Sequence, residues 1–234
     1  HEVLIEKQAG AGIGSNDDEY MAVGATIAAE ATDIFSKADM IIKVKEPQPS
    51  EWAQLSSNQI LFTFLHLAAD APQAYGLAES GCTAIAYETI TDDAGGLPLL
   101  APMSEVAGRL AVIEGATHLK ANAGGCGILI SGVPGTAPAK VVVIGGGVVG
   151  MNAAKMAVGM GACVIVFDRS VTRLRYLSDI FGHRIETRCS SNALLAEAIA
   201  QADMVVGAVL IPGASAPKLV SKAQLVTMKQ GAVL

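Results

Sequence analysis

The sequence has few of the residues that mark secreted, metal-binding or nucleic-acid-binding proteins. Its 234 residues include 4 cysteines, at positions 82, 126, 163 and 189, and none of them form a C-x-x-C pair. This scatter fits neither a disulfide framework nor a metal site, so we expect reduced thiols, no metal and a cytoplasmic protein. Charged residues make up only 16% of the chain, with a net charge of −6 and no basic stripe. We therefore expect no nucleic-acid partner.

Long uncharged apolar runs are also missing. Hydrophobic residues make up 51% of the chain, yet no uncharged, continuously apolar run approaches the roughly 18 residues that a membrane-spanning helix needs. We expect no membrane partner, and a core large enough for one large domain or two smaller ones. The first residue is His1 and the last residues stop inside an expected strand. We interpret the chain as a fragment that lacks both ends of a longer protein.

The most informative stretch is KVVVIGGGVVG at residues 140–150. Its apolar, β-branched run predicts a buried strand, and residues 145–150 (GGGVVG) match the pattern G-x-G-x-x-G. A helix rich in Ala and Met follows, and then a second apolar strand that ends at Asp168. This strand–turn–helix–strand context is the one in which the glycine pattern indicates dinucleotide binding. The alternative is a glycine-rich turn without a ligand.

Each part of this pattern has an expected role. Gly145 permits the tight turn out of the strand, Gly147 lets the backbone approach a pyrophosphate, and Gly150 lets the helix pack on the strand. The N–H groups of Val148 and Val149 lie at the expected helix start, where unpaired donors and the helix dipole favour phosphate.

Asp168 is the acidic residue expected to bind the ribose of the dinucleotide. At the end of the second strand, its carboxylate can accept hydrogen bonds from the 2′- and 3′-hydroxyls and repel a 2′-phosphate. This favours NAD over NADP. The neighbouring Arg169 could accommodate a 2′-phosphate, which keeps the second cofactor open.

Strand and helix patterns also alternate before the fingerprint. We expect strands at 40–45, 59–65 and 83–86, with helices near 51–55 and 72–80. This alternation predicts a parallel sheet with helices on both faces. Ligands of such sheets bind in the crevice beyond the carboxyl ends of the strands.

Lys45 and His66 stand at two of these strand ends. A lysine can bind a small carboxylate and polarise a carbonyl group, and a histidine titrating near neutrality can move protons at a carbonyl oxygen. The alternatives are a solvated lysine and a histidine that merely ends a strand. Alternation along the strand puts Lys43 and Lys45 on one face, and we expect Lys43 to balance acidic neighbours.

The remaining segments complete an α/β fold. We expect two Rossmann-like, doubly wound parallel-sheet domains linked by a long helix, divided at Pro98 and Pro102 into residues 1–98 and 99–234. Ser104 is expected to cap the long helix, which runs to about Lys120. Cys163 is interpreted as strand core. Further expected elements are a strand at 1–7, a loop at 9–15, a helix from 17 to 28, a helix at 171–181, a strand at 184–188, a helix at 192–201, a strand at 202–209, and a closing helix and strand.

Together these motifs resemble the alanine dehydrogenase family, along essentially the whole chain and in order. The matching segments are residues 43–47, 58–70, 85–89, 97–109, 141–150 and 207–220. The resemblance implies oxidative deamination of L-alanine to pyruvate and ammonium with NAD, and the reverse amination, by a homohexamer. The family usually has arginine where this chain has Cys126.

The resemblance also implies roles for individual residues. The histidine matching His66 is a catalytic acid/base, and the lysine matching Lys45 binds the substrate. An arginine and an aspartate that the family also uses lie outside these residues, so we expect the chain by itself to be inactive. Implied cofactor contacts are Ser104, Val148, Val149, Asp168, Arg173, Ser190, Val209 and Leu210.

Other interpretations remain for these residues and for the protein. Arg173 could be a solvated helix charge, and Ser190 a turn residue. The NAD(H)-binding part of a transhydrogenase shares the fold and the APKL segment, although His66 and the sequence KVKEP favour alanine dehydrogenase. A non-catalytic module that senses NAD is the remaining alternative.

Overall fold

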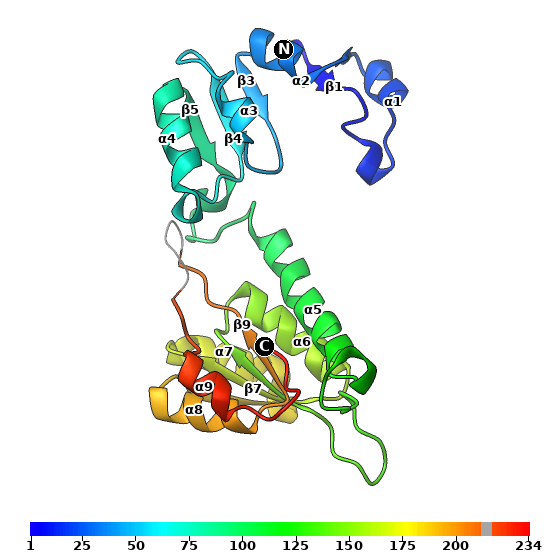
Figure 1. The fold of residues 1–234 in the computed structure, drawn as a ribbon, viewed down its shortest axis with the longest axis vertical. Coiled ribbons are helices and arrows are strands. Elements are labelled where there is room, and N and C mark those ends of the chain that lie inside the picture. Colours follow the sequence, from blue (N-terminus) through cyan, green and yellow to red (C-terminus); the bar gives the residue numbers. More distant parts are fainter. Residues whose placement is uncertain (212–216) are drawn as a thin grey trace. The chain divides into compact units, whose positions relative to one another are not determined.

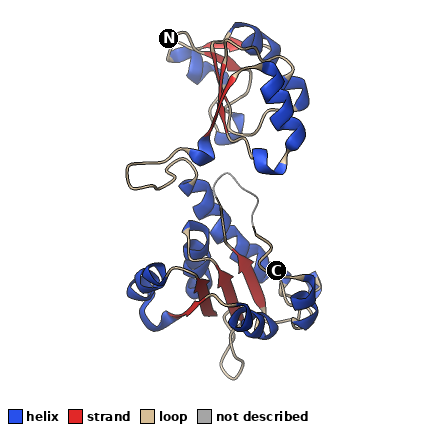
Figure 2. Cartoon of the chain, turned by 90° about the vertical axis from the view of Figure 1, so that its left-hand side faces the viewer, coloured by secondary structure: helices blue, strands red, loops and turns tan. Residues whose placement is uncertain are grey.

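The computed structural model describes residues 1–211 and 217–234, which form two compact units. Among these residues, unit 1 is His1–Leu99, and unit 2 is Leu100–Ile211 with 217–234. Both units are α/β structures built on parallel strands (Figure 1, Figure 2). The predicted fold class is therefore confirmed, and the assignment of substrate binding to the first unit stays a prediction.

Unit 1 holds two small sheets whose strands run parallel. β1 (Leu4–Glu6) pairs with β2 (Thr26–Ala28). The second sheet has the order β3-β4-β5, formed by Met40–Ile42, Ile60–Thr63 and Thr83–Ala86. Because these strands are parallel, the segments that follow them lie at the same edge of the sheet.

Short helices and a small apolar core complete unit 1. Its α-helices are α1 (Asp17–Ala22), α2 (Ala31–Lys37), α3 (Pro49–Trp52) and α4 (Ala71–Ser80). Short 3-10 helices are η1 (Ala11–Ile13), η2 (Leu67–Ala69) and η3 (Tyr87–Thr89). The core behind the three-stranded sheet consists of Phe35, Ile41, Leu55, Leu61, Leu65 and Leu77.

The predicted helix from Asp17 to residue 28 is wrong beyond Ala22. Asn16 caps the helix start, with acidic residues in the first turn. Gly24 then adopts a φ of +95°, a left-handed conformation that no α-helix contains. The chain continues directly into β2, so the amphipathic pattern spans a short helix and a short strand.

Unit 2 is built on a four-stranded parallel sheet with the order β8-β7-β6-β9. In sequence order these strands are β6 (Lys140–Ile144), β7 (Cys163–Asp168), β8 (Ile185–Cys189) and β9 (Met204–Gly207). The order is that of the first half of a doubly wound dinucleotide-binding fold, in which the strand order reverses between the first and fourth strands. That switch point lies here between β6 and β9.

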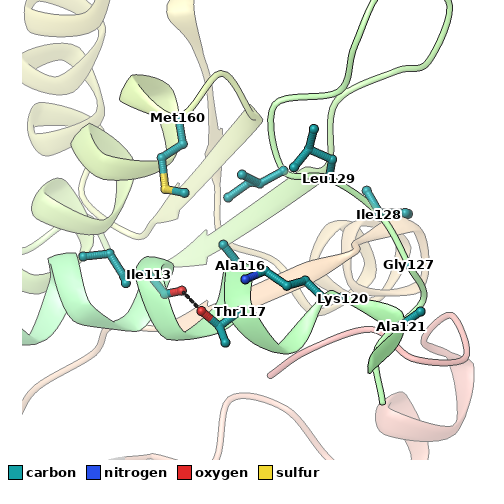
Figure 3. A pocket seen from close by; sticks show the side chains of 10 residues that line it. Ile113, Ala116, Thr117, Lys120, Ala121, Gly127, Ile128, Leu129 and Met160 are labelled. Atoms are coloured by element: carbon teal, nitrogen blue, oxygen red, sulfur yellow. Dashed lines mark hydrogen bonds between the residues drawn. The ribbon is translucent and has the colours of Figure 1, made fainter. Parts of the chain in front are cut away.

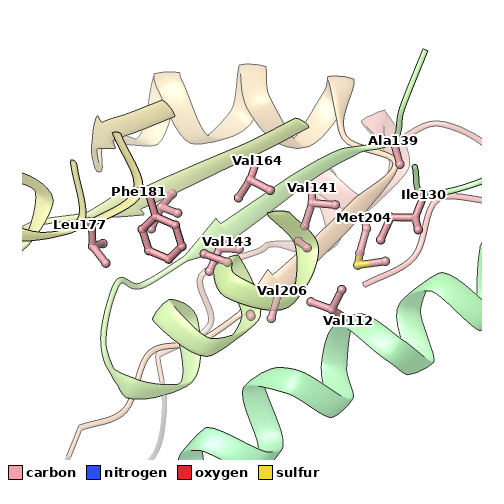
Figure 4. Packing of buried hydrophobic residues seen from close by; sticks show 14 of the residues in the cluster. Val112, Ile130, Ala139, Val141, Val143, Val164, Leu177, Phe181, Met204 and Val206 are labelled. Atoms are coloured by element: carbon pink, nitrogen blue, oxygen red, sulfur yellow. The ribbon is translucent and has the colours of Figure 1, made fainter. Parts of the chain in front are cut away.

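Helices cover both faces of this sheet. Val141 and Val143 of β6 point into one cluster, with Val112 of α5 and residues of α6 and α7 (Figure 4). Val142 and Ile144 point into the opposite cluster, with residues of α8. The helices are α5 (Ala101–His118), α6 (Val148–Gly159), α7 (Val171–Phe181), α8 (Asn192–Gln201) and α9 (Lys222–Thr227), with short 3-10 turns η4 (Ala121–Ala123) and η5 (Gly182–Arg184).

The long helix α5 begins earlier than predicted. It starts at Ala101, with Pro102 in its first turn, and the N–H of Ser104 donates to the carbonyl oxygen of Leu100. Ser104 is therefore inside the helix, and its predicted role as the cap is wrong. Proline fits the first turn because the N–H it lacks has no intrahelical partner there.

Two of the cysteines also lie in informative places. Cys163 begins β7 and is exposed, so its interpretation as strand core is wrong. Cys126 is partly buried against the larger core of unit 2, and its N–H donates to the carbonyl oxygen of Gly231 at 3.0 Å. All four cysteines are within the described residues and are free.

The end of the chain differs from the predicted strand. Val233 forms only an isolated parallel bridge with Met204. Residues 212–216 of the family motif at 207–220 lie outside the described residues.

None of the helices in the described part of the chain has the length and apolar character that crossing a membrane requires.

Candidate functional site

The fingerprint turn joins β6 to α6, and two of its glycines are required by the fold itself. Gly145 has a φ of +102°, and a Cβ there would lie 2.6 Å from the carbonyl oxygen of Ala208. A Cβ on Gly150 would lie 1.7 Å from the carbonyl oxygen of Gly145. Side chains at these positions would force α6 and the segment after β9 away from the turn.

Gly147 differs from these two glycines because its surroundings are open. A Cβ there would meet no atom of the described residues within 4 Å. Gly147 is the N-cap of α6, and no side chain in the described part of the chain caps this helix. The first N–H groups of α6, including those of Val148 and Val149, therefore lie at an uncapped helix end that favours an anion.

Asp168 ends β7 and is fixed beside the fingerprint turn. Its Oδ2 accepts a hydrogen bond from the N–H of Gly146 at 2.7 Å, and its Oδ1 accepts one from Ser170 at 2.8 Å. Each carboxylate oxygen has a further lone pair. The carboxylate is thus held in place by the backbone and can still accept hydrogen bonds from ligand hydroxyls.

Arg173 of α7 also contacts the fingerprint turn. Its Nε donates to the carbonyl oxygen of Gly146, and its terminal nitrogen lies 3.4 Å from the carbonyl oxygen of Gly147. The guanidinium also stacks over Tyr176, 4.7 Å from the ring centre. These contacts exclude a free, solvated charge at Arg173, while contact with a cofactor phosphate stays a prediction.

The other predicted cofactor residues are Ser190, Val209, Leu210 and Ser104. The N–H of Ser190 donates to the carbonyl oxygen of Asp168 at 2.9 Å, which brings Ser190 to the end of β7. Val209 follows β9, and its Cγ2 would lie 2.8 Å from a Cβ on Gly145. Leu210 is exposed, and Ser104 is in α5 one turn before Gly108.

A buried amide that the sequence analysis missed ties α5 to α6. Asn152 is 1% exposed, donates to the carbonyl oxygen of Val148 at 3.0 Å, and accepts from Nε of Arg109 at 3.2 Å. Close by, a Cβ on Gly108 would lie 2.2 Å from the carbonyl oxygen of Val149. An asparagine within the Ala- and Met-rich segment MNAAKMAVG was the sequence signal for this contact.

In unit 1, the two lysines after β3 have different partners. The strand ends at Ile42, earlier than predicted, so strand alternation does not orient them. Lys43 forms an ion pair with Glu51 of α3, which confirms that it balances an acidic neighbour. The Nζ of Lys45 lies 3.6 Å from Oε2 of Glu46, and the Lys45 side chain is 75% exposed. Its ammonium is therefore accessible to a carboxylate from solution.

Glu46 connects Lys45 with His66 electrostatically. A hydrogen bond from its own backbone lowers the pKa of the Glu46 carboxyl, burial opposes this shift, and the charges of Lys45 and His66 reinforce it. Its Oε2 is buried and makes no hydrogen bond to the described residues. Lys45 and His66, in the segments that follow β3 and β4, thus each lie within electrostatic reach of Glu46.

His66 follows β4 in an unusual backbone conformation. Its φ of +50° and ψ of 32° are left-handed, which is uncommon for a residue with a Cβ. The imidazole stacks on Phe64 with ring centres 6.0 Å apart, and Tyr87 packs edge-on against Phe64 at 5.1 Å. Burial raises the pKa of Tyr87. The His66 side chain itself is exposed.

Glu88 is a second residue that the sequence analysis missed. It lies in η3 after β5, and its carboxylate accepts hydrogen bonds from the N–H groups of Leu65 and His66. The sequence signal was an acidic residue just after a strand that neighbours β4. In the parts of the chain that the structure describes, no group of three or more His, Cys, Asp or Glu could hold a metal ion.

A cavity of about 400 Å³ also opens in unit 2 (Figure 3), and none of residues 145–150 of the fingerprint turn lines it. It is lined mainly by apolar side chains from the second half of α5, from residues 127–130 and from Met160. Met160 follows the C-terminal end of α6, whereas the fingerprint turn lies at the N-terminal end. The cavity therefore does not belong to the predicted dinucleotide site.

Family profiles match both units of the chain. The profile described as "Alanine dehydrogenase/PNT, N-terminal domain" matches residues 1–107, and "Alanine dehydrogenase/PNT, C-terminal domain" matches residues 111–234. The resemblance expected from the motifs is thereby confirmed over nearly the whole chain.

Individual relatives agree with these profiles. The chain is 53% identical to an alanine dehydrogenase of Halomonas elongata and 50% identical to one of Bacillus subtilis, in each case over 234 residues. These alignments cover 100% of the chain, but only 63% and 61% of the two relatives. The chain therefore spans a little less than two thirds of their length.

Solved structures show the same relationship. An L-alanine dehydrogenase superposes with a TM-score of 0.87 at 49% identity, covering 100% of this chain and 64% of that one. A transhydrogenase from Sinorhizobium meliloti superposes with a TM-score of 0.77 at 29% identity, covering 99% and 68%. The transhydrogenase is the more distant of the two. From its sequence motifs, its fold and these matches, the chain belongs to the alanine dehydrogenase/PNT family.

Proposed function

We propose that the full-length protein catalyses the NAD-dependent oxidative deamination of L-alanine to pyruvate and ammonium, and the reverse reductive amination. The observation that carries this proposal is 53% identity, along the entire chain, to the alanine dehydrogenase of Halomonas elongata. An exposed lysine and a histidine that both act electrostatically on Glu46, in the segments that follow two neighbouring parallel strands, support it independently.

Unit 2 fits a dinucleotide at the fingerprint turn. The open space at Gly147 and the uncapped N–H groups of Val148 and Val149 suit a pyrophosphate. Asp168 would accept from the ribose hydroxyls and disfavour a 2′-phosphate, which supports NAD over NADP. Bound NAD would supply the hydride acceptor. Further proposed contacts are Ser104, Arg173, Ser190, Val209 and Leu210.

Lys45 and His66 supply the chemistry at the substrate. The ammonium of Lys45 would bind the carboxylate and polarise the neighbouring carbonyl group. Hydrolysis of the imine formed from alanine requires proton transfers at the oxygen that becomes the pyruvate carbonyl. His66 would accept and return these protons, because an imidazole can act as both a base and an acid.

We also propose that the protein acts as a cytoplasmic homo-oligomer, a hexamer by resemblance. An exposed apolar stripe runs along α5. It consists of Met103 (43% exposed), Val106 (57%), Leu110 (48%) and Ile113 (41%). Their spacing of three and four residues places them on one helix face. Such a stripe is typical of subunit contacts. The four free cysteines fit a reducing compartment.

The proposal is tested by following NADH formation from L-alanine with the full-length protein and its His66→Ala variant. The variant should lose turnover by about 10²-fold or more, because it lacks the proton-transfer group. His183→Ala, at an exposed histidine of unit 2, is the matched control and should keep normal turnover.

Two outcomes would contradict the proposal. Near-normal turnover of His66→Ala would remove this histidine from the mechanism. If the wild-type protein binds NADH but forms none from L-alanine, hydride exchange between NADH and an NADP analogue would indicate a transhydrogenase role. Binding without either reaction would indicate a module that senses NAD.

A further inference from the structure

We infer that Glu88 is a positioning residue, which fixes the left-handed backbone conformation of His66 and thereby the direction in which its imidazole points. The inference rests on the proposed function only because that function assigns the imidazole of His66 a role in proton transfer. The conformation itself is a property of unit 1 and can be tested without any reaction.

The first support is the convergence of two backbone N–H groups on one carboxylate. The N–H of His66 donates to Oε1 of Glu88 at 2.7 Å, and the N–H of Leu65 lies 3.2 Å from both oxygens. Hydrogen bonds to an ionised acceptor are stronger than neutral ones. Glu88 therefore holds the end of β4 from the neighbouring segment after β5.

A second residue holds the same peptide group from its other side. Gln73 of α4 is 0% exposed, and its Nε2 donates to the carbonyl oxygen of Leu65 at 2.5 Å. That carbonyl belongs to the peptide unit whose N–H, on His66, donates to Glu88. Both ends of one planar peptide are thus bonded to side chains from different elements, so the unit cannot rotate without breaking both bonds.

Fixing this peptide matters because its orientation sets the φ angle of His66. Among the described residues, only Gln8 and His66 combine a Cβ with a positive φ. Such a conformation persists only where the surrounding structure enforces it. Without the two bonds, rotation of the peptide would let His66 relax to an ordinary conformation, and its Cβ would then point in another direction.

The contacts of Glu88 are with the backbone of His66 and its neighbour. Its carboxylate oxygens accept hydrogen bonds from the N–H groups of Leu65 and His66. A glutamine at position 88 would keep the shape but replace one acceptor oxygen with an NH₂ group facing the N–H of Leu65. The conservative variant Glu88→Gln therefore weakens the clamp while leaving the packing intact.

The test is a double-mutant cycle in the full-length protein, with kcat for L-alanine as the readout. Glu88→Gln should lower kcat by about tenfold, as expected for loss of a charge-assisted bond, with little change in KM for NAD. In the His66→Ala background the same change should have almost no further effect. An equal loss in both backgrounds, or no loss in either, would overturn the inference. Glu79→Gln on the exposed face of α4 is the control.

Gln73 allows a second matched comparison. Gln73 and Gln59 are both buried amides that donate to backbone carbonyls, but Gln59 contacts Phe35 and Ala38 at the opposite end of β4. Replacing either by leucine should lower stability, whereas only Gln73→Leu should also lower kcat. Equal effects on kcat would mean that general loosening of unit 1 explains the result, and would contradict the clamp.

A stability measurement tests the conformation without activity. Glycine adopts a left-handed conformation readily, so His66→Gly should melt at a higher temperature than His66→Ala. At His183, which has no positive φ, glycine should melt lower than alanine. If His66→Gly melts no higher than His66→Ala, the clamp is disproved. If the ordering holds but the wild type does not oxidise alanine, the proposed function fails, whereas the left-handed conformation of His66 stands.

Discussion

At the scale of single residues, two side chains of the same type can have different surroundings and therefore different roles. Lys43 and Lys45 are two positions apart, yet one forms an ion pair with Glu51 and the other has an exposed ammonium. The sequence predicted that one lysine would be balanced and the other available, because only a strand end places a charge near a ligand crevice. The contact of Glu88 with the N–H groups of Leu65 and His66 could not be predicted, since it joins segments that are adjacent only in the fold.

Lys45→Ala should raise the KM for pyruvate by about tenfold or more, because the substrate carboxylate loses a charged hydrogen-bond donor. Lys43→Ala is the matched control, since it removes a lysine already paired with Glu51. It should lower thermal stability without changing this KM. Steady-state kinetics of the reductive direction measure both variants. An unchanged KM in Lys45→Ala would show that this lysine does not bind the substrate.

Glu46 should make the stability of the protein depend on acid pH. Its pKa is lowered in the folded state, so its carboxylate stabilises the fold above the ordinary pKa of about 4.3. This contribution is lost as the pH falls through the lowered pKa. The melting temperature of the wild type should therefore exceed that of Glu46→Gln near pH 7, and the difference should shrink towards pH 3. A difference that grows on acidification would contradict this assignment.

At the scale of elements, the predicted bounds of helices and strands agreed best with the structure where a single sequence signal marks each end. The strand at 163–168 and the helices at 171–181 and 192–201 were predicted with the observed bounds. Their ends carry single clear signals, such as Ser170 and Ser191, which cap α7 and α8.

The start of α5 shows the opposite case. Pro102 and Ser104 each mark a helix start, and the proline marks the true one. In the same way, the helix predicted from Asp17 ends before Gly24, which has a left-handed φ and precedes β2. Local patterns indicated the right kinds of element, but the positions of Pro102 and Gly24, rather than Ser104 and the amphipathic pattern, mark where these two elements start and stop.

The fingerprint turn gives a direct test at this scale. Gly150→Ala should lower the melting temperature strongly and abolish NADH binding, because its Cβ would lie 1.7 Å from the carbonyl oxygen of Gly145. Gly147→Ala meets nothing within 4 Å and should leave the melting temperature unchanged while weakening NADH binding. Thermal unfolding and NADH fluorescence titration measure the pair. Equal loss of stability in both would show that the open space at Gly147 is not reserved for a ligand.

At the scale of the whole molecule, the two units carry separable parts of the proposed function. The fingerprint turn, Asp168 and Arg173 belong to unit 2, whereas Lys45 and His66 belong to unit 1. The α/β class with parallel strands was predictable because alternating strand and helix patterns extend along the chain. Substitutions at His66 should therefore impair turnover and leave NADH binding by unit 2 intact.

The most direct test follows the hydride itself. The full-length protein is incubated with NAD and L-alanine that carries deuterium at Cα, and the products are analysed by mass spectrometry. The proposed reaction predicts NADH that carries the deuterium, with an equal amount of pyruvate and ammonium. A protein that binds NADH yet yields no deuterated NADH and no pyruvate would contradict the proposal that this member of the family oxidises alanine.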